Sequence, residues 1–347
     1  MSLVAESRFN AGCDLLGKNE MGKRALICGI SGQDGSYLAK LLLERGYEVW
    51  GSSRDAEQST FHNARHFGIY DSLHLVSLHL RDVGSTIGLL QRIRPHQIYN
   101  LTGQSSVGLS FEQPVETVES IALGTLNLLE AVRLTDREIH LYNAGSTECF
   151  GDTGVGVADE GTRFNPCSPY AVAKASAYWA VANYRDAYDL FACTGILSNH
   201  DSPLRPQRFV TRKIVHAVAL IALGGDTELS LGNLEIERDW GWAPEYVSAM
   251  ALMLEQDAPQ DYIIATGQSH SLTEFVETAF HLIGKDWRDY VKLDMHLMRP
   301  TDILHNKVNP GKAAAGLGWK AASAMKDVIA MMLESEMGNL GASGSTT

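Results

Sequence analysis

Hydrophobic and polar positions follow two different periods along the first two-thirds of the chain. Short apolar runs, typical of buried strands, occur at residues 25–30, 47–54, 73–80, 96–103, 138–146 and 191–199. Between them, apolar residues recur at helical spacing, most clearly at 36–46, 115–134 and 169–188. Strands that alternate with helices predict an α/β fold, with a parallel sheet covered on both faces.

After about residue 198 the pattern loosens into more widely spaced elements. Helical spacing continues at 210–224, 243–256 and 271–284, and short apolar runs fall at 229–233 and 261–267. No Pro/Gly/Ser-rich linker separates the two parts, so we expect two lobes that share one chain. The expected division is an extension at 1–21, a first domain at 22–197 to which segments near 239–268 return, a second lobe at 198–335 and a Gly/Ser-rich flexible tail at 336–347.

A glycine-rich turn, GISGQDG, follows the first strand and opens the first helix. Gly29, Gly32 and Gly35 are spaced three residues apart, a variant of the Rossmann spacing. Glycines let the backbone turn tightly and approach a pyrophosphate, which then lies at the helix N-terminus. The strand before the turn and the helix after it meet the structural condition for this motif. We therefore predict a Rossmann-like doubly wound sheet that binds a dinucleotide, with a smaller mixed α/β lobe at the C-terminal end.

The end of the second predicted strand bears on the type of dinucleotide. Nineteen residues after Gly35 comes Arg54, where NAD-binding proteins tend to place an acid for the ribose 2′-hydroxyl. An arginine at this point favours a 2′-phosphate, and hence NADP. Asp55 follows directly and could serve NAD instead. NADP is therefore favoured, and NAD stays open.

Two further motifs supply candidate acid–base chemistry. SPYAVAK places Tyr170 and Lys174 four residues apart, on one face of a predicted helix. A lysine cation near a phenol stabilises the phenolate, so we expect the pKa of Tyr170 to fall from about 10 and the side chain to accept a proton from a sugar hydroxyl. In NAGSTECFG, Ser146 ends a predicted strand and Glu148 comes two residues later. A carboxylate with an ordinary pKa of about 4.3 is ionised at neutral pH and can act as a base.

Composition narrows the classes of function. The net charge of −12 argues against a general nucleic-acid-binding surface. Five cysteines without a C-x-x-C pair are typical of reduced thiols in the cytoplasm, and the histidines show no metal-ligand spacing. No run is apolar for long enough to span a membrane, and no signal-peptide pattern opens the chain. We expect a cytoplasmic protein with no metal, in which the basic cluster RPQRFVTRK suits a nucleoside diphosphate.

An ordered set of motifs resembles a known family. The glycine turn is followed by NLTGQSS, STE, SPYAVAK, NHDSP, FVTRK, ERDWG, IATG and RPTD. From about residue 22 to 335 the chain resembles the extended short-chain dehydrogenase/reductase family and, within it, the GDP-mannose 4,6-dehydratases. The resemblance implies a Rossmann domain for NADP and a smaller lobe for a GDP-sugar. It implies four catalytic residues: Ser146, Glu148, Tyr170 and Lys174.

Binding residues are also implied by the resemblance. Those implied to contact the cofactor are Gly29, Ile30, Ser31, Gly32, Gln33, Asp34, Gly35, Arg54, Asp82, Val83, Leu101, Thr102, Gly103, Gln104, Ser105, Tyr170, Lys174, His200 and Arg205. Those implied to contact the substrate are Asn199, Val210, Lys213, Arg238 and Arg299.

The reaction implied by the resemblance removes water from the sugar. Tyr170 would take the proton from O4 as the C4 hydride passes to NADP⁺, with Ser146 hydrogen-bonded to the developing ketone. The ketone acidifies the neighbouring C5–H, which Glu148 would abstract before returning the proton to the departing 6-hydroxyl. Hydride returns to C6, so the reaction has no net redox change.

Some positions depart from the family pattern and leave alternatives open. SSRDAEQST has one arginine where the family usually has two, in a loop that also contributes to tetramer contacts, and Thr102 and Gly145 replace commoner alanines. The assembly is expected to be a homodimer or a homotetramer, and the substrate GDP-mannose or a related sugar such as a GDP-heptose. The main alternative is a GDP-4-keto-6-deoxyhexose reductase or an epimerase that uses Ser146, Tyr170 and Lys174 without Glu148. A non-catalytic NADP-binding sensor is disfavoured because such proteins commonly lose the tyrosine or lysine.

Overall fold

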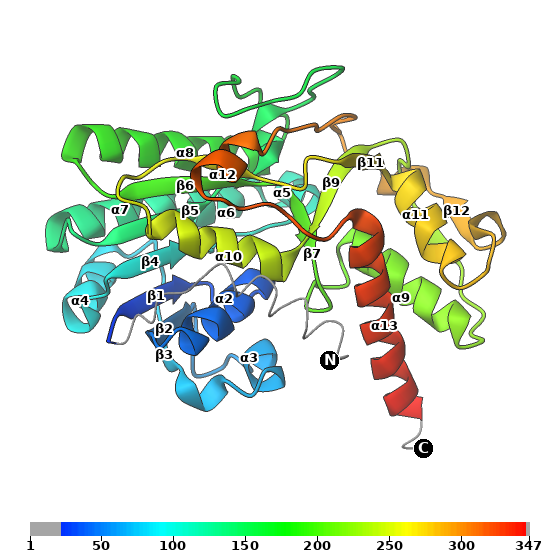
Figure 1. Cartoon of the computed structure of the whole chain (residues 1–347), viewed down its shortest axis with the longest axis horizontal. Coiled ribbons are helices and arrows are strands. Elements are labelled where there is room, and N and C mark those ends of the chain that lie inside the picture. Colours follow the sequence, from blue (N-terminus) through cyan, green and yellow to red (C-terminus); the bar gives the residue numbers. More distant parts are fainter. Residues whose placement is uncertain (1–21, 345–347) are drawn as a thin grey trace.

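The computed structural model describes residues 22–344, in two lobes that lie side by side (Figure 1). The expected extension at 1–21 lies outside the described residues. The larger lobe is built on a seven-stranded sheet with the order β10-β6-β5-β4-β1-β2-β3, and its neighbouring strands are all parallel. The predicted Rossmann-like sheet is therefore confirmed. Its strands are β1 (Arg24–Cys28), β2 (Glu48–Ser53), β3 (His74–Ser77), β4 (Gln97–Asn100), β5 (His140–Ala144), β6 (Ala192–Leu197) and β10 (Tyr262–Ile264).

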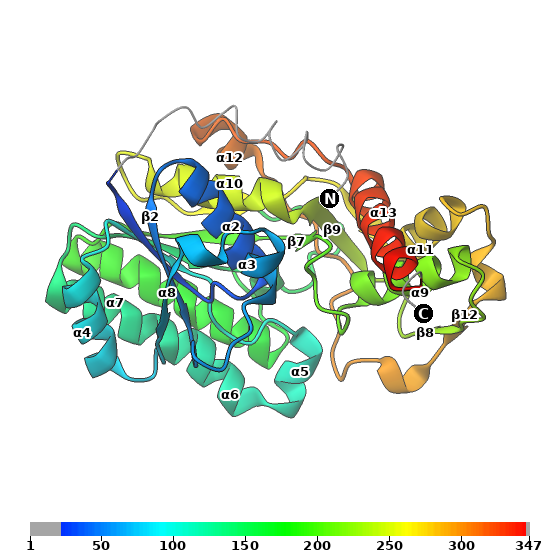
Figure 2. The ribbon, with the colours of Figure 1, turned by 90° about the horizontal axis from the view of Figure 1, so that it is seen from below.

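Helices cover both faces of this sheet, as Figure 2 shows. One face carries α4 (Val83–Ile93), α5 (Val107–Glu112), α6 (Pro114–Val118), α7 (Gly124–Thr135) and α8 (Pro169–Tyr188). The other carries α2 (Gln33–Glu44), α3 (His62–His66), α10 (Ala243–Leu254) and α12 (Gly311–Gly316). The helix expected at 115–134 is present, with a π-helical segment at Glu119–Leu123 between α6 and α7.

Strand β1 shows why the strands of the large sheet are continuous apolar segments in the sequence. Ala25 and Ile27 belong to the core under α2 and α10, whereas Leu26 and Cys28 belong to the core under α4, α7 and α8. All four side chains are fully buried, because successive residues of a strand point to opposite faces and both faces are covered.

The smaller lobe packs three helices around its own apolar core. They are α9 (Val210–Ala222), α11 (Leu272–His281) and α13 (Met325–Gly344). A three-stranded sheet, β11-β9-β7, and a two-stranded sheet, β12-β8, complete this lobe. Their strands are β7 (Asn199–Asp201), β8 (Leu229–Leu231), β9 (Glu237–Trp242), β11 (Ser269–Ser271) and β12 (Val291–Leu293). Among the described residues, no helix is long and apolar enough to cross a membrane.

The expected flexible tail is wrong for most of its length, because α13 continues to Gly344. Tertiary packing explains the difference from the Gly/Ser-rich composition. Glu336 is buried and forms ion pairs with Arg212 and His216 of α9, and Met337 and Leu340 pack against the core of the smaller lobe. Residues 345–347 lie outside the described part of the chain.

Candidate active site

The glycine turn joins β1 to α2 at the point where the strand order of the sheet reverses. Gly29 has φ of +90°, and a Cβ atom there would lie 2.8 Å from the carbonyl oxygen of Leu101. A Cβ atom on Gly35 would lie 2.5 Å from the carbonyl oxygen of Gly29. Gly32 is the N-cap of α2, and no side chain caps this helix. The bare helix N-terminus at the switch point of a doubly wound sheet fits the pyrophosphate of a dinucleotide.

Two of the predicted cofactor residues bind each other across the lobes. The Asp34 carboxylate lies 2.9 Å from Nε2 of His200, and Gln33 donates to Asp34 at 3.0 Å and to the carbonyl of His200 at 3.1 Å. Burial alone would raise the pKa of Asp34, but His200 holds it below its ordinary value. Burial alone would lower the pKa of His200, and the Asp34 carboxylate raises it. Arg205, close by, pairs with Asp201 at 3.1 Å.

Arg54 stands at the end of β2, as expected, with a side chain that is 79% exposed. It lies 3.6 Å from a carboxylate oxygen of Glu116 on α6, which also pairs with Arg81. Asp55 accepts hydrogen bonds from the backbone N–H groups of two residues just downstream, at 3.1 and 3.0 Å. Its carboxylate thus caps a local turn. Glu116 and Arg81 were not singled out in the sequence because their link to Arg54 is tertiary.

The remaining predicted cofactor residues lie at the ends of β3 and β4. Leu101 to Ser105 follow β4, and the positive φ of Gly103 turns this segment beside the glycine turn. Asp82 is the N-cap of α4 and accepts from the N–H of Ser85 at 3.0 Å. The Ser85 side chain and, next, its backbone N–H lower the pKa of the Asp82 carboxyl. Val83 begins the same helix.

The four predicted catalytic residues meet where β5 ends against α8. Ser146 accepts a hydrogen bond from the N–H of Glu148 at 3.2 Å, and its hydroxyl also bonds to the phenol of Tyr170. Lys174 donates to the carbonyl of Ala144, the last residue of β5, at 2.7 Å. The four side chains are all buried. The structure thus brings together residues that are as much as 28 positions apart in the sequence, 146 to 174.

The expectation that Lys174 lowers the pKa of Tyr170 is wrong for this arrangement. Burial dominates and raises the pKa of the phenol, and the Lys174 ammonium is hydrogen-bonded to the carbonyl of Ala144. Burial also lowers the pKa of Lys174 to about 8. The phenol is therefore protonated at neutral pH in this state.

Glu148 has a partner that the sequence did not indicate. Its carboxylate lies 3.3 Å from Nε of Arg238, a residue of β9 predicted to contact substrate phosphate. Arg238 in turn lies 3.5 Å from Asp302, which also pairs with Arg299 at 3.3 Å. Asp302 belongs to the RPTD motif, which was recognised in the sequence, but the sequence did not indicate its ion pairs with Arg238 and Arg299.

The other predicted substrate residues belong to elements of the smaller lobe. Asn199 is on β7 and Val210 begins α9. Lys213, on the same helix, donates to the carbonyl of Ser230 at 2.7 Å.

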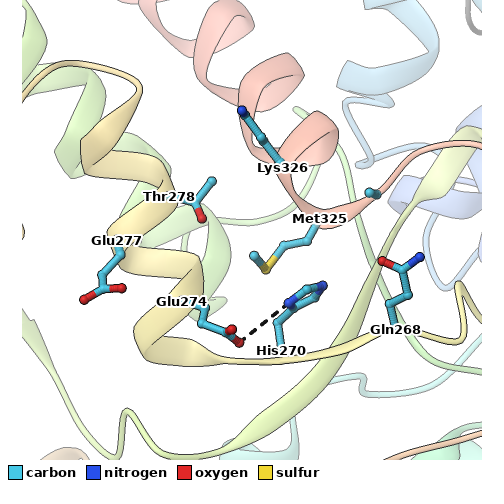
Figure 3. Close-up of a pocket in the computed structure, with 8 residues that line it drawn as sticks. Gln268, His270, Glu274, Glu277, Thr278, Met325 and Lys326 are labelled. Carbon is cyan, nitrogen blue, oxygen red and sulfur yellow. Dashed lines mark ion pairs between the residues drawn. The ribbon is translucent and has the colours of Figure 1, made fainter.

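A separate hollow of about 340 Å³ lies between α11 and the start of α13 (Figure 3). His270 and Glu274, neighbours at the junction of β11 and α11, pair beside it at 3.6 Å, and Lys326 of α13 also lines it. It contains none of the predicted site residues. Within residues 22–344, no cluster of side chains could hold a metal ion.

Comparisons with known proteins identify the family of the chain. The family model for GDP-mannose 4,6 dehydratase matches residues 26–332. GDP-mannose 4,6 dehydratase 1 of Arabidopsis thaliana is 45% identical over 327 residues, which cover 91% of this chain and 90% of the relative. The human GDP-mannose 4,6 dehydratase is 41% identical over 351 residues, which cover 92% and 94% of the two chains.

Solved structures show the same fold. A dTDP-glucose 4,6-dehydratase of Streptomyces venezuelae has a TM-score of 0.82 and 22% identity, with 92% of this chain and 98% of that chain covered. A UDP-glucose 4-epimerase of Thermus thermophilus has a TM-score of 0.78 and 25% identity, with 91% and 99% covered. Because the family model matches residues 26–332 and relatives above 40% identity cover more than 90% of the chain, the chain belongs to the GDP-mannose 4,6-dehydratase family.

Proposed function

We propose that the protein is a hydro-lyase that converts GDP-mannose to GDP-4-keto-6-deoxymannose and water. The observation that carries this proposal is the burial of Glu148 in one group with Ser146, Tyr170 and Lys174. Oxidation of the C4 alcohol needs a proton acceptor and a hydrogen-bond donor to the developing ketone. Ser146, Tyr170 and Lys174 supply these functions. A dehydration needs, in addition, a carboxylate that can take the C5 proton, and Glu148 is the residue placed to do so.

A nicotinamide dinucleotide is the cofactor that the residues fit. When bound, a nicotinamide would supply a hydride acceptor for C4, a hydride donor for C6 and, in its oxidised form, a positive charge that favours the Tyr170 phenolate. The turn from Gly29 to Gly35 would hold its pyrophosphate. Structural relatives solved with NAD or NADPH support this class of cofactor.

The chain's own residues account for every proton transfer except the one that C5 receives from solvent. Tyr170 takes the O4 proton and Ser146 hydrogen-bonds O4 as C4 becomes a ketone. Glu148 then takes the C5 proton, which the ketone has acidified, and gives it to the 6-hydroxyl as the C6–O bond breaks to release water. C5 regains one proton from solvent, which balances the one lost from O4. Ionised Glu148 is left ready for the next turnover.

Water loss without added reductant tests the proposal. The purified protein with its bound cofactor is incubated with GDP-mannose, and the product is weighed by mass spectrometry. We expect the mass to fall by one water and no NADPH to be consumed. Glu148→Gln should lower the rate by about 10²–10⁴-fold, the usual contribution of an acid–base residue, with cofactor binding unchanged. Undiminished water loss in this variant would overturn the role of Glu148, and stoichiometric use of NADPH would indicate a reductase.

NADP is the proposed form of the cofactor. Arg54 is exposed at the end of β2 and free to turn toward a 2′-phosphate, while the Asp55 carboxylate is occupied by backbone N–H groups. Glu116 competes with that phosphate for Arg54. We expect Arg54→Ser to weaken NADPH binding by about 10- to 100-fold, because a charge-assisted hydrogen bond contributes about 1.5–3 kcal/mol. Glu116→Gln should strengthen NADPH binding, and neither substitution should change the binding of NADH. Fluorescence titration of both cofactors measures these effects, and tighter NADH binding in the wild type would refute the assignment.

The outer face of α6, α7 and α8 is the proposed contact with a second copy of the chain. It exposes large apolar side chains, among them Val115 at 68% and Trp179 at 61%. Faces of this kind in soluble proteins mark association sites. We expect light scattering to show a homo-oligomer, and Trp179→Glu to dissociate it. Leu223→Glu, at an exposed apolar residue that follows α9, is the matched control and should leave the assembly intact.

A further inference from the structure

The segment from Ser146 to Phe150, which we call the catalytic turn, carries two of the proposed catalytic side chains. Ser146 is the N-cap of a short 3₁₀ helix, Thr147–Phe150, and Glu148 lies in the first turn of that helix. Hydrogen bonds in a 3₁₀ helix have poorer geometry than those in an α-helix, so such a segment depends on contacts from the rest of the fold. The positions of Ser146 and Glu148 therefore depend on what holds the backbone of this turn.

A segment far along the chain, residues 304–308, lies against the catalytic turn. We call it the connecting segment, because it follows the RPTD motif and leads to α12 of the larger lobe. Its backbone is held from two sides. On one side, the N–H of Thr153 donates to the carbonyl of His305 at 2.9 Å. On the other, the N–H of Glu237 in β9 donates to the carbonyl of Leu304 at 2.6 Å.

The side chains of the connecting segment alternate in direction, as they do along a β-strand. His305 and Lys307 both pair with the carboxylate of Glu237, at 3.2 and 2.8 Å. Asn306 lies between them in the chain and is buried, whereas its two neighbours are partly exposed. The connecting segment therefore directs the Asn306 side chain toward the interior.

The Asn306 side chain reaches the first helical residue of the catalytic turn. Its amide Nδ2 donates to the carbonyl of Thr147 at 3.0 Å, and the Asn306 carbonyl accepts from the hydroxyl of Ser269 at 3.1 Å. Val308, the next inward residue, belongs to the same apolar cluster as Phe150 at the other end of the turn. The connecting segment thus holds the catalytic turn near both of its ends.

We infer that Asn306 is a positioning residue that fixes the catalytic turn and so aligns Ser146 and Glu148 with the sugar. The inference rests on the proposed function, which assigns these two side chains to the reaction. Asn306 acts through the backbone of Thr147, which lies between them in the chain. Asn306 and Thr147 are each only 1% exposed, so solvent cannot take the place of the amide. Without this donor, the buried carbonyl would lose a partner, and the turn would shift to find another.

Removal of the amide donor tests this role. Asn306→Leu has nearly the shape of asparagine but donates no hydrogen bond to Thr147. With the enzyme in saturating excess over GDP-mannose, we expect the single-turnover rate constant for water loss to fall by about 10²-fold. This is the usual cost of a shift of about 1 Å in a catalytic group. The dissociation constant for GDP, measured by calorimetry, should change by less than about threefold, because the turn acts on the sugar.

The rate constant separates a positioning role from a loss of folded protein. A variant that is merely less folded has fewer working sites, but each of these keeps the wild-type rate constant. Ser323→Ala is the matched control, since Ser323 is also buried and its hydroxyl donates to the carboxylate of Glu245 on α10 at 2.6 Å. We expect both variants to lower the urea midpoint, and only Asn306→Leu to lower the rate constant.

A second variant applies if Asn306→Leu does not fold. The Thr153 hydroxyl donates to the carbonyl of His305 at 3.2 Å and accepts from the N–H of Lys307 at 3.1 Å, on either side of Asn306. Thr153→Val keeps the shape of the side chain and removes both bonds. We expect the rate constant to fall by about 2- to 10-fold, the effect of one ordinary hydrogen bond, with GDP affinity unchanged.

Two results would overturn the inference. One is a wild-type rate constant in Asn306→Leu or, where that variant does not fold, in Thr153→Val. The other is a raised dissociation constant for GDP with no change in the rate constant, which would make Asn306 a part of the binding site. Failure of the proposed function is distinguishable, because the wild type itself would then release no water from GDP-mannose.

Discussion

Gly145, between β5 and Ser146, is where a single methyl group should disturb the catalytic residues. Its N–H donates to the carbonyl of Gly195 on β6 at 2.8 Å. A Cβ atom would lie 2.7 Å from Cγ2 of Thr194 and 3.0 Å from that same carbonyl oxygen. Thr194 is fully buried, so its methyl group cannot swing into solvent. The Thr194 methyl group therefore leaves no room for a side chain at Gly145.

We expect Gly145→Ala to lower the free energy of unfolding by about 1–3 kcal/mol, the usual effect of an overpacked methyl group. Thr194→Ser removes Cγ2 and should lower it by about 0.8 kcal/mol, the value of one buried methylene. The double variant should be more stable than the sum of the two predicts, by about 1 kcal/mol, because the new methyl group occupies the space of the old one.

Urea unfolding followed by circular dichroism measures these differences, and kcat reports on the displacement of Ser146. Gly145→Ala should reduce kcat, since a shift of about 1 Å in a catalytic group can cost about 10²-fold, and Thr194→Ser should restore part of it. Additive stabilities with no recovery of kcat would refute the packing argument.

Three further outcomes are expected. Gly35→Ala should abolish NADPH binding in a fluorescence titration, because its Cβ would lie 2.5 Å from a backbone oxygen, whereas Gly32→Ala, at 3.4 Å, should weaken it less. The pKa of Lys174 is about 8, below the ordinary value of 10.5 for a lysine, so the folded state binds fewer protons than the unfolded state between these pH values, and the stability contributed by this group rises with pH. Lys174→Met should therefore be more stable than the wild type, most clearly below pH 8. A difference in the free energy of unfolding, measured in urea, that stays constant up to pH 10.5 would contradict this. Glu336→Gln should lower the free energy of unfolding by about 3–5 kcal/mol, because it leaves Arg212 buried without its carboxylate, and an unchanged urea midpoint would count against it.

The local features of the site were predictable because each depends on residues close in sequence. The glycine turn follows from the order strand, glycines, helix, and Tyr170 and Lys174 follow from helical spacing. Ser146 and Glu148 were visible as polar residues at the end of a strand. The parallel sheet followed from alternation of the two periods.

The electrostatics of the site could not be predicted in the same way. Glu148 and Arg238 are 90 positions apart, and Arg54 and Glu116 are 62 apart, so their pairing depends on the fold. The pKa of Tyr170 depends on burial, which outweighs the lysine four residues away. The C-terminal helix formed despite its glycines because Glu336 found partners on α9.

The path of the chain between the lobes has a mechanical consequence. The chain leaves the large lobe after β6 and returns to it with α10 and β10. It enters the smaller lobe again at β11, and later α12 packs on β10 of the large lobe and α13 on α9 of the smaller one. Cutting the backbone once, for example between Pro203 and Phe209, would leave two fragments that each contribute to both lobes. Such a nicked enzyme should stay associated on gel filtration and unfold in a single transition, with neither lobe released as an autonomous module.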